Sequence, residues 1–115
     1  MPVSIKRVYD PPAGSDGKRI LIDRLWPRGL TKQQAAVDLW MKDVAPSTSL
    51  RQWFGHDPAR WVEFQRRYTA ELAHGTALAE LRKAAAEGHV TLVYGAKDKR
   101  HNDAVVLQRV LARGA

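Results

Sequence analysis

Residues 19–29 read Arg-Ile-Leu-Ile-Asp-Arg-Leu-Trp-Pro-Arg-Gly, and this stretch carries most of the information about the fold. Its apolar run, Ile20 to Ile22, lacks the alternation of a half-exposed strand and predicts an interior strand covered on both faces. We expect the strand over residues 19–26, because a proline and a glycine follow it. Residues 90–94, Val-Thr-Leu-Val-Tyr, predict a second interior strand. The two strands should be parallel and adjacent, or nearly so.

Helical segments separate and follow these strands. Another strand is expected over residues 4–9, and a last helix follows the polar stretch 97–103. Earlier helices are expected to start at capping residues, which are Thr31, Ser47, Asp57 and Thr76. This order of elements predicts one small α/β domain over residues 1–115, with a mostly parallel sheet flanked by helices.

Composition narrows the classes of function. A chain of 115 residues has room for one core, and it contains no cysteine. The lack of cysteine excludes a disulfide framework, a thiolate metal site and a cysteine nucleophile. The four histidines lack zinc-type spacing, so no metal is expected. No run approaches the ~20 apolar residues of a membrane span, which favours a cytoplasmic protein without a membrane partner.

The charge balance favours anionic partners. Lysine and arginine total 19 against 12 acidic residues, a net charge of +7. Such a field attracts phosphorylated metabolites, nucleotides, nucleic acid or an acidic protein face. Basic residues are scattered along the chain, so the alternative that charge serves only solubility stays open.

A first group of chemically active side chains follows the strand at residues 19–26. In open α/β sheets, ligands bind beyond the carboxyl ends of the strands. Arg24 and Arg28 can bind phosphate or carboxylate in a bidentate manner, and Trp26 offers a ring for stacking. Asp23 can act as a base or orient an arginine. The structural alternative is that Asp23 pairs with an arginine while Trp26 fills the core.

A second group follows Tyr94. A glycine there lets the backbone approach a ligand closely, and the amino end of the last helix supplies free N–H groups for an anion. Lys97 adds positive charge, and Asn102 adds a polar contact. His101 or Asp98 can transfer protons. The alternative for Asp98 and Asn102 is that they cap the helix.

Several motifs together resemble the YeaO-like family of bacterial proteins, a domain of unknown function numbered 488. The most specific is Asp-Arg-Leu-Trp-Pro-Arg-Gly at residues 23–29, and further likeness lies at residues 6–10, 16–17, 20–22, 45–51, 68–72, 91–92, 96–97 and 102. The resemblance implies a small α/β domain without an assigned reaction. Residues that fit the family pattern are Asp23, Arg24, Trp26, Pro27, Arg28, Lys97 and Asn102. Asp98, His101 and Asp103 stand where relatives carry other polar groups.

The leading hypothesis is a cleft between the two groups that binds a small phosphorylated, nucleotide or carboxylate ligand. Hydrolase or transferase activity is left open, with Asp23 as the catalytic residue. The expected ligand-binding residues are Arg24, Trp26, Arg28, Lys97 and Asn102. The alternative is a basic module that binds nucleic acid weakly, or another protein, without catalysis. The sequence specifies neither a cofactor nor an oligomeric state.

Overall fold

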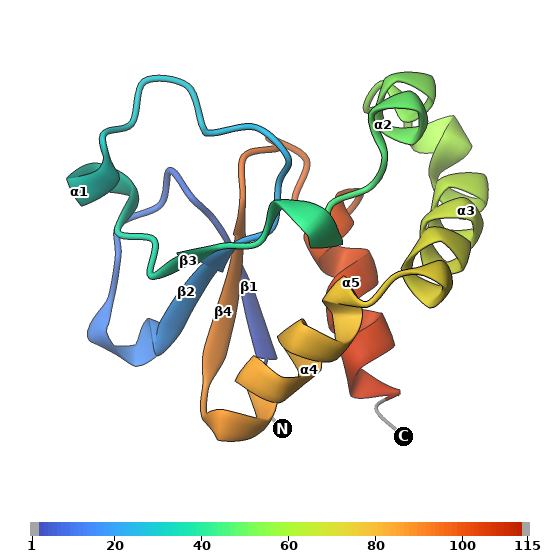
Figure 1. Ribbon diagram of the computed structural model, residues 1–115. Helices are drawn as coiled ribbons and strands as arrows, with labels where there is room; N and C mark the ends of the chain where they lie inside the picture. The colour runs from blue at the N-terminus through green and yellow to red at the C-terminus, as the bar shows by residue number, and fades with distance from the viewer. Residues whose placement is uncertain (1–2, 114–115) are drawn as a thin grey trace.

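Within residues 3–113, which the computed structural model describes, four parallel strands form one sheet in the order β1-β4-β2-β3 (Figure 1). The strands are β1 (Val3–Arg7), β2 (Lys18–Leu21), β3 (Leu39–Trp40) and β4 (Val90–Tyr94). β2 and β4 are direct neighbours, and Ile20 pairs with Leu92. The predicted parallel arrangement of the two apolar segments is therefore confirmed, and so is the α/β fold class.

The two amino-terminal strands are shorter than the sequence predicts. β2 ends at Leu21 and not at residue 26, and β1 ends at Arg7 and not at residue 9. Both strands pair with β4, which itself ends at Tyr94. The last bonds to β4 are donated by Val8 N to Tyr94 O at 2.7 Å and by Ile22 N to Val93 O at 3.2 Å. Beyond Tyr94, β4 offers no further hydrogen-bond partner, so the segments that follow β1 and β2 leave the sheet as loops.

Helices connect the strands and follow the last of them. They are α1 (Lys32–Ala35), α2 (Thr48–Phe54), α3 (Trp61–His74), α4 (Ala77–Glu87) and α5 (Asp103–Ala112). Three of the four predicted caps are confirmed: the hydroxyl of Thr31 accepts from Gln34 N, and that of Ser47 accepts from Leu50 N. Asp57 accepts from Ala59 N and caps the single turn Pro58–Arg60 that precedes α3. Thr76 stands at the start of α4 but its side chain makes no capping bond.

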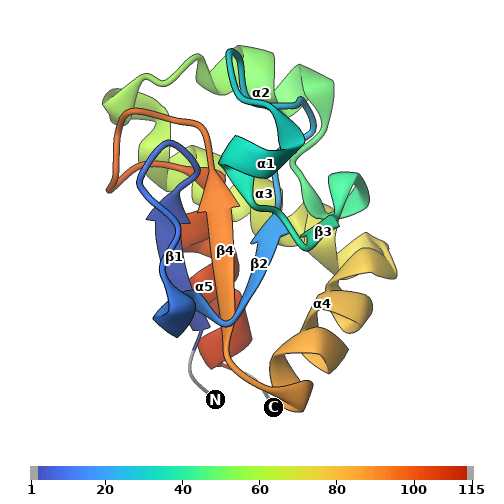
Figure 2. The ribbon, with the colours of Figure 1, turned by 90° about the vertical axis from the view of Figure 1, so that its left-hand side faces the viewer.

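The sheet separates two unequal layers. Figure 2 shows α5 behind β1 and β4, with α3 and α4 on the same far side, while only the short α1 lies in front. The far side holds the main core, where the α3 stripe of Phe64, Tyr68 and Leu72 joins Ile20 and Leu92. Strand side chains alternate between faces, so Ile20 and Leu92 point toward the helices while their neighbours point the other way.

The near side of the sheet is covered by loops and not by long helices. Part of it is a small apolar cluster of Val8, Leu21, Ala35 and Val93, against which Trp26 and Trp40 pack. Trp40 also donates its indole N–H to Asp23 O at 2.7 Å. The loop that carries Asp23 is thus held on the sheet from the side opposite the main core.

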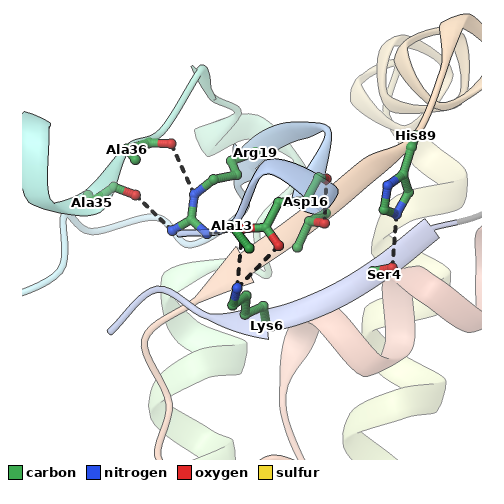
Figure 3. Close-up of polar contacts among 9 residues, drawn as sticks. Ser4, Lys6, Ala13, Asp16, Arg19, Ala35, Ala36 and His89 are labelled. Carbon is green, nitrogen blue, oxygen red and sulfur yellow. Dashed lines mark hydrogen bonds and ion pairs between the residues drawn. The ribbon is translucent and has the colours of Figure 1, made fainter. Parts of the chain in front are cut away.

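The rest of the near side is polar (Figure 3). The buried Asp16 carboxylate accepts from Arg19 Nη1 at 2.8 Å, from Lys6 Nζ at 3.2 Å and from Ala13 N at 3.0 Å. The backbone hydrogen bond from Ala13, with the bonds from the two cations, lowers the pKa of Asp16 to about 2. Arg19 also donates to the carbonyls of Ala35 and Ala36, so the cluster ties α1 to the sheet.

Candidate functional site

A cleft of about 380 Å³ opens at the carboxyl ends of β2 and β4. Because these strands are parallel neighbours, the loops that follow them emerge at the same edge of the sheet. The wall facing the loops comes from α2, α3 and the turns beside them. The lining residues are Asp23, Arg24, Leu25, Trp26, Pro27, Arg28, Ala45, Pro46, Arg51, Phe54, His56, Phe64, Gly95, Ala96, His101, Asn102 and Asp103.

Asp23 joins the two loops. Its Oδ2 accepts a hydrogen bond from Gly95 N at 2.8 Å. A Cβ added at Gly95 would lie 3.3 Å from that oxygen, so the glycine permits this close approach. Within residues 3–113 Asp23 forms no ion pair, so the structural alternative in which it pairs with an arginine is not seen there.

Asp103 lies beside Asp23 and was not among the residues predicted to form the site. It is the first residue of α5, and its Oδ1 accepts from Ala104 N at 3.0 Å. Its side chain lines the same cleft as that of Asp23. Burial, with the neighbouring Asp23 charge, raises the pKa of Asp103 well above its usual range.

Three arginines line the cleft. Arg24 donates from Nε to Pro46 O at 3.4 Å, whereas Arg28 and Arg51 are exposed. None of the three forms an ion pair with a carboxylate in the part of the chain that the structure describes. Arg24 and Arg28 were predicted, while Arg51 comes from a different element, the exposed side of α2. Lys97 is exposed and does not belong to the lining.

Asn102 caps α5. Its Oδ1 accepts from Val105 N at 3.0 Å and its Nδ2 donates to Asp98 O at 2.9 Å. The residue is 3% exposed and borders the cleft. Asn102 therefore has the capping role that the sequence offered as an alternative. Its side-chain amide has little hydrogen-bonding capacity left for a ligand.

Asp98 organises the loop before α5. Its Oδ1 accepts from the backbone N–H groups of Arg100 and His101, and its Oδ2 lies 2.8 Å from His101 Nδ1. These contacts, led by the bond from Arg100, lower the pKa of Asp98. The His101 ring borders the cleft and packs edge-on against Trp61 at 5.2 Å between centroids. Asp98 thus fixes the position of a histidine at the cleft.

Trp26 supports the first loop. Its Nε1 donates to Leu30 O at 2.8 Å, and its ring packs edge-on against Trp40 at 5.4 Å between centroids. The loop is therefore held rigidly where it borders the cleft, while the indole N–H is already used.

Across residues 3–113 no group of three His, Asp or Glu side chains could hold a metal ion. No helix in that range is long and apolar enough to cross a bilayer.

Comparisons with known proteins cover almost the whole chain. A family model described as the inactive DUF488-N3 subclade matches residues 2–114. The uncharacterized protein YeaO of Escherichia coli (strain K12) is 45% identical over 111 residues, or 93% of this chain and 94% of that protein. The uncharacterized protein Rv3073c of Mycobacterium tuberculosis (strain ATCC 25618 / H37Rv) is 44% identical over 109 residues, or 95% and 92%. No solved structure matches the chain.

Proposed function

Because the chain belongs to the DUF488 family, in the subclade described as inactive, we propose that its cleft binds a small anionic ligand without converting it. The resemblance deduced from the sequence motifs is confirmed by this membership. The proposed ligand class is the one predicted from the sequence, a small molecule bearing a phosphate or carboxylate. Binding without turnover takes the place of the hydrolase or transferase that the sequence left open.

The observation that carries the proposal is the set of arginines at the cleft. Arg24, Arg28 and Arg51 bring three guanidinium groups to one opening, and none has a carboxylate ion-pair partner within residues 3–113. Like charges gathered without a counterion repel each other. An anion with several oxygens relieves this repulsion and satisfies the planar donor forks of the arginines.

The amino end of α5 adds to the same field. The helix starts at Asp103, so its positive dipole end lies at the cleft that the arginines line. The wall formed by Phe54 and Phe64 is apolar, with ring centroids 4.3 Å apart and an angle of 19° between the rings. A volume of about 380 Å³ falls in the range of small-molecule sites. These features support a ligand that has an anionic group on an apolar or aromatic body.

Catalysis receives less support than binding. The expected catalytic residue Asp23 accepts a backbone hydrogen bond from Gly95 N and so joins the two loops, which is a positioning arrangement. The relatives reported above carry no named activity, and the subclade is described as inactive. Asp23 is accordingly proposed as a residue that shapes the cleft.

The proposal is tested by thermal melting in a series of inorganic phosphate concentrations at constant ionic strength. A ligand present at roughly 100 times its dissociation constant stabilises a fold by about 2.7 kcal/mol. We expect wild type and Lys83→Ala to show the same stabilisation, because Lys83 is exposed on α4 and outside the cleft lining. Arg28→Ala should melt like wild type without phosphate and lose most of the gain with it. Equal stabilisation of all three proteins by phosphate would contradict the assignment of Arg28 to the anion site.

A further inference from the structure

One histidine at the cleft is held in a fixed orientation. Its Nδ1 lies 2.8 Å from Asp98 Oδ2, and the His101 ring packs edge-on against Trp61 at 5.2 Å between centroids. The His101 side chain is nevertheless 31% exposed, and it lines the cleft. The other histidine of the lining, His56, lies exposed on the turn after α2. His101 is therefore the imidazole that the surrounding protein positions at the cleft.

The contact with Asp98 decides which ring nitrogen of His101 is available. A carboxylate only accepts hydrogen bonds, so Nδ1 carries the hydrogen that is donated to Asp98. The other ring nitrogen, Nε2, has no hydrogen-bond partner from the protein within residues 3–113. It accepts a hydrogen bond when the ring is neutral and donates one when the ring is charged. His101 thus offers one free nitrogen to a ligand in the cleft.

The cationic and imidazole donors of the cleft come from three separate parts of the chain. Arg24 and Arg28 lie on the loop after β2, and Arg51 lies on α2 in the facing wall. His101 lies on the loop before α5. A carboxylate has two oxygens in one plane, which a single guanidinium fork satisfies. A phosphate monoester has three free oxygens, which can accept from donors on different sides. The spread of donors therefore fits a phosphate better than a carboxylate.

The acidic side chains of the lining are engaged by the backbone. Asp23 Oδ2 accepts from Gly95 N, and Asp103 Oδ1 accepts from Ala104 N. Neither carboxyl forms an ion pair with a cleft arginine within residues 3–113. The guanidinium groups are therefore available to the ligand.

From this arrangement, we propose that the anionic group bound in the cleft is a phosphate monoester, and that His101 selects it. The arginines bind the phosphate oxygens, while Nε2 of His101 shares a proton with one of them. An imidazole and a phosphate monoester both titrate near neutral pH, so one of the two carries that proton. A sulfate monoester or a carboxylate carries a single negative charge and no such proton, so its bond to Nε2 is weaker. This inference rests on the proposed function and narrows its ligand class.

The test compares three probes that share a phenyl ring. Phenyl phosphate has three free oxygens and a second ionisation, phenyl sulfate has the same oxygens and a single charge, and phenylacetate has a planar group with a single charge. Each probe is titrated into the full chain by calorimetry at neutral pH and constant ionic strength. Phenyl phosphate should bind at least about tenfold more tightly than either of the others, because its bond to His101 is charge-assisted.

Two variants locate the preference at His101. His101→Gln removes the titratable nitrogen, so phenyl phosphate should lose about tenfold in affinity while phenyl sulfate changes little. His74→Gln makes the same substitution at an exposed histidine outside the cleft lining, and it should bind all probes like wild type. The ¹⁵N shift of His101 Nε2 in wild type gives an independent reading if His101→Gln does not fold. It should move as phenyl phosphate saturates the protein.

The outcomes separate the two proposals. If none of the three probes binds wild type, the anion site itself is wrong. The anion site stands and phosphate selection by His101 falls if phenyl phosphate binds wild type no more tightly than either of the other probes. The same conclusion follows if His101→Gln keeps the preference for phosphate, or if saturation with phenyl phosphate leaves the Nε2 shift unchanged.

Discussion

Among single residues, Asp16 makes the clearest contribution to stability. It accepts hydrogen bonds from Lys6, Arg19 and Ala13 on the polar side of the sheet, and its pKa falls from 3.8 to about 2. This shift corresponds to about 2 kcal/mol of folding free energy at neutral pH. Because the folded-state pKa is the lower one, the stabilisation is present above pH ~4 and disappears as the pH falls toward ~2.

Asp16→Asn should therefore lower the free energy of unfolding at pH 7 by about 2 kcal/mol, measured by urea denaturation. The difference from wild type should shrink steadily below pH ~4. Asp43→Asn is the matched control, because Asp43 is exposed and forms no ion pair within residues 3–113. Equal stability of the two variants at pH 7 would contradict the role of the Asp16 cluster.

The residues of the candidate site were predictable in part. Asp23, Arg24 and Arg28 follow the apolar run at residues 20–22, and the rule that ligands bind at strand ends predicts their place at the edge where the cleft lies. Arg51 and Asp103 were missed because their roles depend on which elements face the loop across the cleft. That arrangement follows from helix packing, which a single sequence does not display.

At the scale of elements, α5 depends on its cap. Asn102 is buried and accepts from Val105 N, so it satisfies one of the free N–H groups at the start of the helix. Asn102→Ala should lower the free energy of unfolding by about 1–2 kcal/mol, measured by urea denaturation. Asn102→Ser restores an acceptor oxygen and should recover part of this loss. An Ala variant as stable as wild type would show that the cap is dispensable.

Elements were predicted more reliably than their boundaries. Ile20 and Leu21 lie in β2 and residues 90–94 form β4, and both are buried because both faces of the sheet are covered there. β2 ends at Leu21, five residues before the predicted end at residue 26. A strand stops where its neighbour stops, and residues 19–29 alone do not show where β4 ends. The apolar pattern of residues 38–44 fits either a short strand or an irregular stretch, and they form the two-residue strand β3 followed by a single turn, Lys42–Val44.

For the whole molecule, the net charge of +7 predicts weak attraction to nucleic acid. Part of the basic surface is already neutralised, since Glu63 binds both Arg66 and Arg67 on α3. We expect weak binding to single- and double-stranded DNA without sequence preference, falling steeply with salt in fluorescence anisotropy titrations. A tight, sequence-selective and salt-resistant complex would instead favour the nucleic-acid alternative.

Nuclear magnetic resonance can locate the bound anion residue by residue. Phosphate is added to ¹⁵N-labelled protein at constant ionic strength while backbone amide shifts are followed. We expect concentration-dependent shifts that saturate at Arg28, Arg51, Gly95 and Asp103, which line the cleft. Shifts that concentrate instead at Arg66 and Arg109 on the outer sides of α3 and α5, with the cleft amides unchanged, would contradict it.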